Sequence, residues 1–118
     1  MPHPDMPKYR HAFPDFDYGL PELPQFEDMS NKNDTCPHLL STELGLKLFC
    51  DYADPARREE GAEHRYTLYL ANKDGDAIDA AGNETGATTG TALVATDDWD
   101  AVLAAIETHR NAMTAPRV

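Results

Sequence analysis

Proline is concentrated at one end of this 118-residue chain. Seven of its nine prolines lie at or before Pro37, and only Pro55 and Pro116 follow. Because proline fixes φ and lacks the backbone N–H, this density breaks helices and removes donors from strands. We therefore expect residues 1–33 to form an extended, polyproline-like N-terminal arm and residues 34–118 to form a compact domain.

The same arm is rich in large aromatic side chains, which is unusual for a disordered tail. Five of the chain's ten aromatic residues lie in it, and each offers about 150–250 Å² of surface for burial. Such an arm becomes ordered by lying on its own core or on a neighbouring chain. The sequence therefore predicts partner binding through five side chains: Tyr9, Phe13, Phe16, Tyr18 and Phe26.

Alternating apolar residues predict the strands of the domain. Asn72-Lys73-Asp74-Gly75 is typical of a tight hairpin turn, because Asp-Gly tolerates the positive φ angles that such a turn needs. Four strands are expected, at residues 46–52, 66–71, 76–80 and 91–95.

Two helices are also expected. Pro37 suits the first turn of a short helix that ends at Gly45 in the left-handed conformation. A longer C-terminal helix follows Thr96 or Asp97, either of which can cap its free amides. Its apolar side chains recur at helical spacing: Trp99, Val102, Leu103 and Ile106. The predicted fold is α+β, with a small antiparallel sheet of about four strands packed by the C-terminal helix and preceded by the extended arm.

The formal net charge is −11, from 21 acidic and 10 basic residues. Direct nucleic-acid binding is not expected, because duplex binding depends on Lys and Arg that neutralise phosphates. No apolar run approaches the roughly 20 residues of a membrane helix, and the chain does not begin with the cationic-then-apolar pattern of a secretion signal. We expect a soluble protein without membrane insertion.

The acidity has three interpretations: adaptation to high salt, presentation of carboxylates to a basic partner, and plain colloidal stability. The second would make the protein an acidic inhibitor or a nucleic-acid mimic. Its candidate carboxylates are Asp97, Asp98, Asp100, Glu59 and Glu60.

The sequence contains candidate residues for a metal site and for a catalytic thiol, but the number of residues between them is unfavourable. Zinc modules use a closely spaced cysteine pair and a close histidine pair, and this pattern is absent from the set Cys36, His38, Cys50 and His64. A Cys36–Cys50 disulfide and a Cys50–His64 catalytic dyad stay open as alternatives. The interpretation that we favour is a buried Cys50 and a free, partly covered Cys36.

An oxygen-rich stretch suggests calcium, but neither possible register matches the EF-hand, which needs Gly and Glu at fixed positions. The stretch contains Asp74, Asp76, Asp79, Asn83 and Glu84. A solvated hairpin turn explains these residues without a metal, and we expect no metal or other cofactor.

The sequence lacks a Gly-x-Ser-x-Gly elbow, a His-Glu-x-x-His pair and a phosphate-binding loop. We therefore expect a non-enzymatic structural or accessory subunit of a larger assembly that docks through its arm. A virion decoration or minor structural protein and a supernumerary subunit of a large complex are the two forms considered. The acidic inhibitor and a small metal- or thiol-dependent enzyme are the alternatives.

Overall fold

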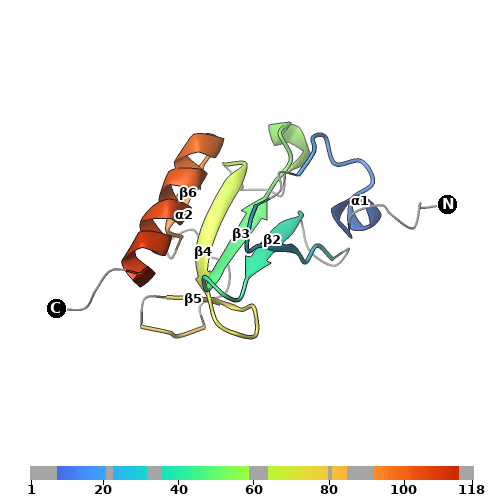
Figure 1. The fold of residues 1–118 in the computed structure, drawn as a ribbon. Coiled ribbons are helices and arrows are strands. Elements are labelled where there is room, and N and C mark those ends of the chain that lie inside the picture. The colour runs from blue at the N-terminus through green and yellow to red at the C-terminus, as the bar shows by residue number, and fades with distance from the viewer. Residues whose placement is uncertain are drawn as a thin grey trace.

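The computed structural model describes residues 8–20, 23–31, 36–58, 64–79, 81–84 and 92–114. In chain order these form α1 (Lys8–Ala12), β1 (Glu27–Asp28), β2 (His38–Ser41), β3 (Leu46–Cys50), the 3₁₀ helix η1 (Pro55–Arg57), β4 (Tyr66–Ala71), β5 (Ala77–Ile78), β6 (Val94–Thr96) and α2 (Trp99–Thr114). Figure 1 shows the sheet between α2 on one side and α1 on the other.

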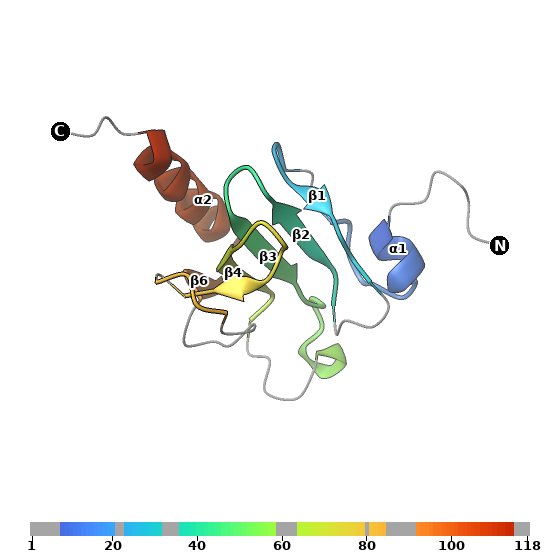
Figure 2. The ribbon, with the colours of Figure 1, turned by 90° about the horizontal axis from the view of Figure 1, so that it is seen from below.

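The strands form one antiparallel sheet in the order β1-β2-β3-β4-β5, and β6 also pairs with β4. Figure 2 shows β1, β2 and β3 lying side by side. The α+β class and the C-terminal helix are confirmed. The expected strand number of about four is too low, because the described residues form a sheet of six strands.

The short helix expected between Pro37 and Gly45 is wrong, because residues 38–41 form strand β2. Strands β1 and β3 pair with β2 on its two sides and supply its backbone hydrogen bonds. Gly45 does adopt the left-handed conformation, with φ of +66°, but it closes the turn between β2 and β3. Its N–H donates to the carbonyl oxygen of Ser41 at 2.9 Å.

The strand predictions around the hairpin differ in accuracy. β4 falls where the alternation placed it, whereas β3 ends at Cys50 and so is two residues shorter than the predicted 46–52. Gly75 has the expected positive φ, +86°. β5 is shorter than the predicted 76–80, of which Ala80 lies outside the described residues. β6 covers Val94–Thr96 in place of the predicted 91–95, of which Thr91 lies outside the described residues. Val94 pairs with Leu68 of β4 and packs against the core.

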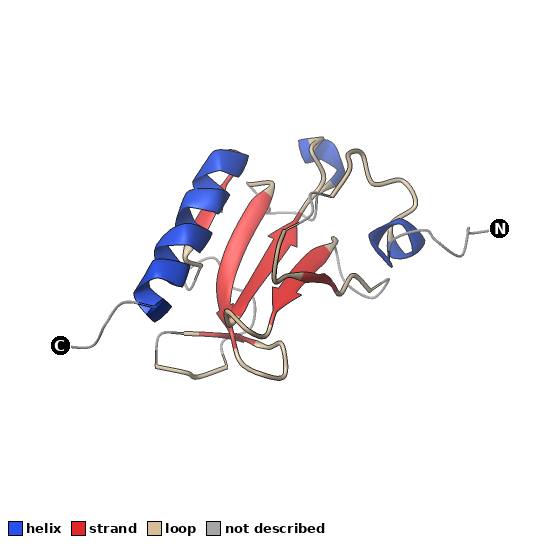
Figure 3. Ribbon diagram, in the orientation of Figure 1, coloured by secondary structure: helices blue, strands red, loops and turns tan. Residues whose placement is uncertain are grey.

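The core lies between the sheet and α2. Along β3 every second side chain is fully buried, as the period of two predicts. The cross-strand register adds Leu68 and Tyr66 of β4 to the same face. Val102 and Ile106 of α2 pack onto this face, which Figure 3 shows as a helix lying along the sheet.

Helix α2 is capped by Asp98, one residue after the later of the two predicted positions. The Asp98 carboxylate accepts the N–H of Asp100 at 3.0 Å, as an N-cap residue does. The Thr96 hydroxyl instead accepts the N–H of Asp98 at 3.0 Å. At the other end, His109 Nε2 donates to the Leu44 carbonyl oxygen at 2.7 Å and ties α2 to the β2–β3 turn. Of the described helices, none is long and apolar enough to cross a membrane.

The described residues of the predicted arm contain α1 and β1 and contact the core of their own chain. Phe13 and Phe16 are 8% and 3% exposed and belong to the same core cluster as the strands. Tyr9, Tyr18 and Phe26 are half-buried against this cluster. This part of the arm therefore supplies apolar surface to a domain that is small for its own stability.

Candidate functional site

A row of aromatic rings crosses the core side of the sheet from α1 to α2. We call it the aromatic belt; its members are Tyr9, Phe16, Tyr18, Tyr52, Tyr66 and Trp99. Their ring centroids lie 4.3–6.4 Å apart between neighbours, in edge-to-face or tilted contacts. Contacts of this geometry add to the stabilisation from burial itself.

The belt has an inner and an outer side. Phe16, Tyr52 and Tyr66 are buried, whereas Tyr9, Tyr18 and Trp99 are half-buried and reach the surface. The belt thus belongs to the core on one side and presents aromatic surface on the other.

Two arginines lie against the belt. The Arg65 guanidinium is 4.2 Å from the ring centre of Tyr18 and 5.1 Å from that of Tyr66. The Arg10 guanidinium is 5.0 Å from the ring centre of Tyr9, and it donates to the carbonyl oxygens of Phe16 and Tyr18. Cation–π contacts of this kind hold each arginine in a fixed orientation.

The belt tyrosines are held by hydrogen bonds between the arm and the segment after β3. The Tyr18 hydroxyl donates to the Asp51 carbonyl oxygen at 2.6 Å, and burial raises the pKa of Tyr18 well above its usual range. The Tyr52 hydroxyl donates to the Asp15 carboxylate at 3.0 Å. Burial and this bond raise the pKa of Tyr52 to about 12, so both phenols stay protonated near neutral pH.

Asp17 fastens the arm to the residues before η1. Its carboxylate accepts the N–H of Ala53 at 2.9 Å and the N–H of Asp54 at 2.8 Å. Desolvation raises the pKa of Asp17, but the backbone donors outweigh it, so this pKa lies below the ordinary value of 3.8. The folded chain therefore favours the ionised form of Asp17.

Asp17→Asn is expected to lower the free energy of unfolding at pH 7 by about 0.5–1 kcal/mol, a small effect because the group is exposed. A lowered folded-state pKa gives stability above the unfolded value of 3.8, which is lost as the pH falls through the folded-state pKa. Urea titrations of both proteins should therefore converge below that pH. Asp74→Asn, on the exposed hairpin, is the matched control, and an equal loss in both variants would contradict the role of Asp17.

The structure brings together three of the five residues predicted to bind a partner, because Tyr9, Phe16 and Tyr18 all belong to the belt. Phe13 is buried in the core, and Phe26 is half-buried at its edge. Their contact with a partner stays a prediction.

Sequence reasoning missed the other half of the belt. The sequence places Tyr52 and Tyr66 in expected strands and Trp99 on the apolar side of the C-terminal helix. The signal was available, since the alternation that buries Cys50 also places Tyr52 and Tyr66 on the core side. The contact of these rings with the arm depends on the tertiary fold.

The four zinc-type residues do not form one site. His38 pairs with Phe49 on the sheet face opposite to Cys50, because neighbouring residues of a strand point to opposite faces. His64 lies beside Asp97, with 3.9 Å between its Nδ1 and the carboxylate. Within the described ranges, no three side chains of His, Cys, Asp or Glu are placed to hold a metal ion.

Cys36 and Cys50 are both buried and are not joined by a disulfide, so the structure does not support the alternative of a Cys36–Cys50 disulfide. Cys50 is fully buried, and burial raises the pKa of its thiol well above its usual range. A catalytic thiol needs the opposite, a lowered pKa and access to solvent. The environment of Cys50 therefore does not favour the Cys50–His64 dyad.

The oxygen-rich stretch uses its oxygens to shape turns. The Asn72 side-chain oxygen accepts the N–H of Asp74 and of Asp76, each at 3.0 Å. The Asp79 carboxylate accepts the N–H of Ala81 and of Asn83, each at 2.9 Å. These bonds give the side chains of Asn72 and Asp79 a structural role in the turns.

Two of the carboxylates proposed for a basic partner, Asp97 and Asp98, have local roles in the structure. Asp97 accepts the N–H of Arg65 at 2.7 Å, and Asp98 caps α2. Glu59 and Glu60 lie outside the described residues. The acids near α2 and those of the β4–β5 hairpin lie at opposite ends of β4, an arrangement that does not favour a single acidic face.

Comparison with known proteins gives no relative from which a function can be carried over. No family model, no curated protein and no solved structure matches the chain significantly.

Proposed function

We propose that the protein is a non-enzymatic structural or accessory subunit of a larger assembly and that it docks through its N-terminal arm. The supporting observation is the aromatic belt, whose outer side carries Tyr9, Tyr18 and Trp99 beside two arginines. Tyr, Trp and Arg are the residue types that contribute most binding energy at protein interfaces. A virion decoration or minor structural protein and a supernumerary subunit are the kinds of assembly component proposed.

In this proposal, one set of arm side chains packs into the core and another set contacts the partner. Phe13 and Phe16 face inward and fix the arm on its own chain. Tyr9 and Phe26 stay half-buried and keep surface for a second contact. An arm held in place before binding loses little conformational entropy on association, which favours affinity.

The experiment compares the full chain with a double variant, Tyr9→Ala and Phe26→Ala, both tagged and expressed in the native source. The expected result is a complex much larger than one chain by size-exclusion chromatography with light scattering, and its loss in the double variant. Phe49→Ala is the matched control, because Phe49 is also a half-buried phenylalanine but lies on the opposite sheet face. Its complex should persist.

Folding is checked by the thermal midpoint of each variant, so that loss of the complex is not confused with loss of the fold. A chain that stays monomeric in native extracts would contradict the proposal. Equal weakening of the complex by Phe49→Ala would contradict docking through the arm.

A further inference from the structure

Gln25, in the arm, adopts a backbone conformation that residues other than glycine rarely adopt. Of the described residues other than glycine, it is the one with a positive φ, +71°. Pro24 precedes it, and the N–H of Phe26 donates to the carbonyl oxygen of Leu23 at 3.2 Å. Proline followed by a residue with positive φ defines a type II turn, in which glycine or asparagine is the preferred residue after proline. Glutamine at this position therefore carries backbone strain.

The side chain of Gln25 is held by the C-terminal helix. Arg110 of α2 donates two hydrogen bonds to the Gln25 side-chain oxygen, from Nε at 3.2 Å and from Nη2 at 3.0 Å. Arg110 Nη1 also donates to the carboxylate of Glu107, three residues earlier in the same helix, at 2.6 Å. The contact joins the arm directly to the last helix of the chain. We call the pair of Gln25 and Arg110 the latch.

The latch bonds and the backbone strain act in opposite directions. Gln25 is exposed and Arg110 is half-buried, so each hydrogen bond between them makes a modest net contribution. The strain of a residue other than glycine in the left-handed region is of comparable size. The turn therefore keeps this conformation because the bonds from Arg110 offset its strain, and loss of these bonds lets the turn relax.

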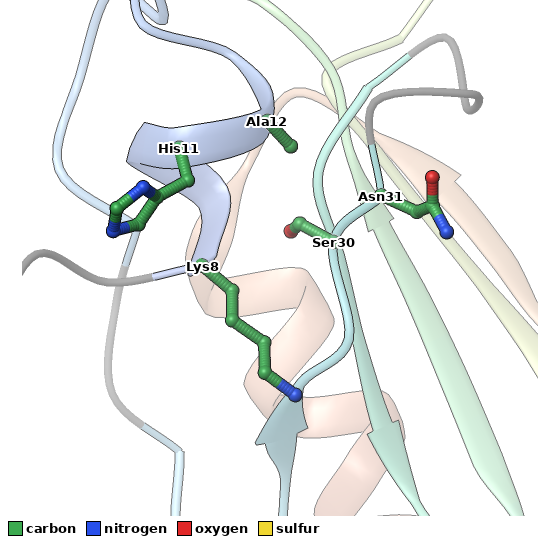
Figure 4. Close-up of a pocket in the computed structure, with 5 residues that line it drawn as sticks. All are labelled: Lys8, His11, Ala12, Ser30 and Asn31. Atoms are coloured by element: carbon green, nitrogen blue, oxygen red, sulfur yellow. The ribbon is translucent and has the colours of Figure 1, made fainter. Parts of the chain in front are cut away.

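The start of the arm is fastened separately from the latch. Asp28 Oδ2 accepts the N–H of Tyr9 at 2.9 Å, and Asp28 Oδ1 accepts the N–H of Ser30 at 3.0 Å. Figure 4 shows this end of the molecule, with Ala12 of α1 and Ser30 directed toward each other across an open pocket. These contacts involve neither member of the latch. An effect of the latch is therefore expected at the turn and not at α1.

We propose that Gln25 is a positioning residue for docking: the latch holds the Leu23–Phe26 turn in place and so fixes the Phe26 side chain at the surface. This role rests on the proposed function, in which Phe26 contacts the partner. Phe26 follows Gln25 directly, and its half-buried ring packs against the core cluster. A relaxed turn gives this side chain more than one position, and a partner that binds one of them then binds more weakly.

The first test is a double-mutant cycle on the purified full chain, with Gln25→Gly, Arg110→Ala and both changes together. NMR measures the exchange of the Phe26 amide hydrogen, corrected for the intrinsic rate of each sequence. Arg110→Ala is expected to raise this exchange about fivefold, because the strain then lacks the bonds that offset it. Adding Gln25→Gly should lower it again about fivefold, because glycine adopts a positive φ without strain.

The effect of glycine in the two backgrounds separates the latch from any other contact of Arg110. In the unaltered chain Gln25→Gly removes bonds and strain together, so the exchange should change by less than about twofold. Lys73→Ala, which removes a basic side chain from the exposed hairpin, is the matched control and should have no effect. The Phe13 amide, which donates to the Tyr9 carbonyl oxygen at 2.8 Å, is the internal reference.

Three results of this cycle would overturn the proposal. The first is an unchanged exchange of the Phe26 amide in Arg110→Ala. The second is the same effect of Gln25→Gly in both backgrounds, since the two residues would then act independently. The third is a parallel change at the Phe13 amide, which would show that the whole arm responds and not the turn alone.

The second test measures docking with the tagged full chain expressed in the native source. Arg110→Ala is expected to reduce the amount of large complex about threefold, and the added Gln25→Gly should restore part of it. If the complex persists unchanged in Arg110→Ala, the positioning role is wrong and the accessory role stands. If the unaltered chain is monomeric in native extracts, both docking roles are wrong, while a coupled cycle still shows the latch as a feature of the fold.

Discussion

Phe16→Ala is expected to lower the free energy of unfolding by about 3–5 kcal/mol, the usual range for removing a buried phenylalanine side chain. Phe16 is 3% exposed, and its ring contacts those of Tyr9, Tyr18 and Tyr52. Truncation removes these contacts and leaves a cavity at the junction of arm and sheet. Since small domains have about 5–15 kcal/mol of total stability, the loss is a large part of the whole. Urea denaturation followed by tryptophan fluorescence measures it, because Trp99 contacts the core cluster.

Phe26→Ala is the matched control for this experiment. It removes the same side chain from another position of the arm, but Phe26 is only half-buried, so the expected loss is about 1–2 kcal/mol. If Phe16→Ala does not fold, Phe16→Leu gives a smaller loss at the same site. Equal losses from Phe16→Ala and Phe26→Ala would contradict the packing of the arm into its own core.

Gly45→Val is expected to lower the free energy of unfolding by about 2 kcal/mol or more, because β-branched residues strongly disfavour the left-handed region. Gly45 has φ of +66°, and a β-carbon there would lie 3.3 Å from the Ala71 carbonyl oxygen. The backbone cannot move away easily, since the Ala71 N–H donates to the Gly45 carbonyl oxygen at 2.8 Å. The midpoint of urea denaturation, at an unchanged slope, measures the loss.

Gly82→Val separates conformational strain from crowding. Gly82 has φ of +88°, but no atom lies within 4 Å of a β-carbon built there. This variant should lose only the strain contribution, on an exposed turn, and so be less affected than Gly45→Val. A larger loss at Gly82 would show that the close approach of Gly45 to Ala71 does not determine the effect.

The local sequence pattern was sufficient to predict the strands, turns and helices whose characteristic residues lie within a few positions of one another. The alternation of Leu46, Leu48 and Cys50 predicted β3 and its buried face, because the side-chain period of a strand is two. Asp74-Gly75 predicted the hairpin turn for an equally local reason, the positive φ of Gly75. Helix α2 followed from its apolar spacing, although its capping residue was misplaced.

The candidate site was only partly predictable. The aromatic content of the arm identified Tyr9, Phe16 and Tyr18, but not the rings that they contact. Tyr18 meets Tyr66 only because the arm crosses the sheet, and no spacing in the sequence encodes that contact. Helix α1 and Ser30 likewise lie close together only in the folded chain, where the Asp28 carboxylate accepts the N–H of Tyr9 and the N–H of Ser30.

The sequence by itself determined the α+β class, the strands β3 and β4, the hairpin turn after β4, and the C-terminal helix, since each depends on local periodicity or turn chemistry. The tertiary structure decided the rest. Residues 38–41 become a strand because β1 and β3 offer hydrogen-bonding partners that outweigh local helix signals. The tertiary structure also decides which side of the arm faces inward. Phe13 and Phe16 are buried against strands whose residues come later in the sequence, and no local pattern in the arm encodes this contact.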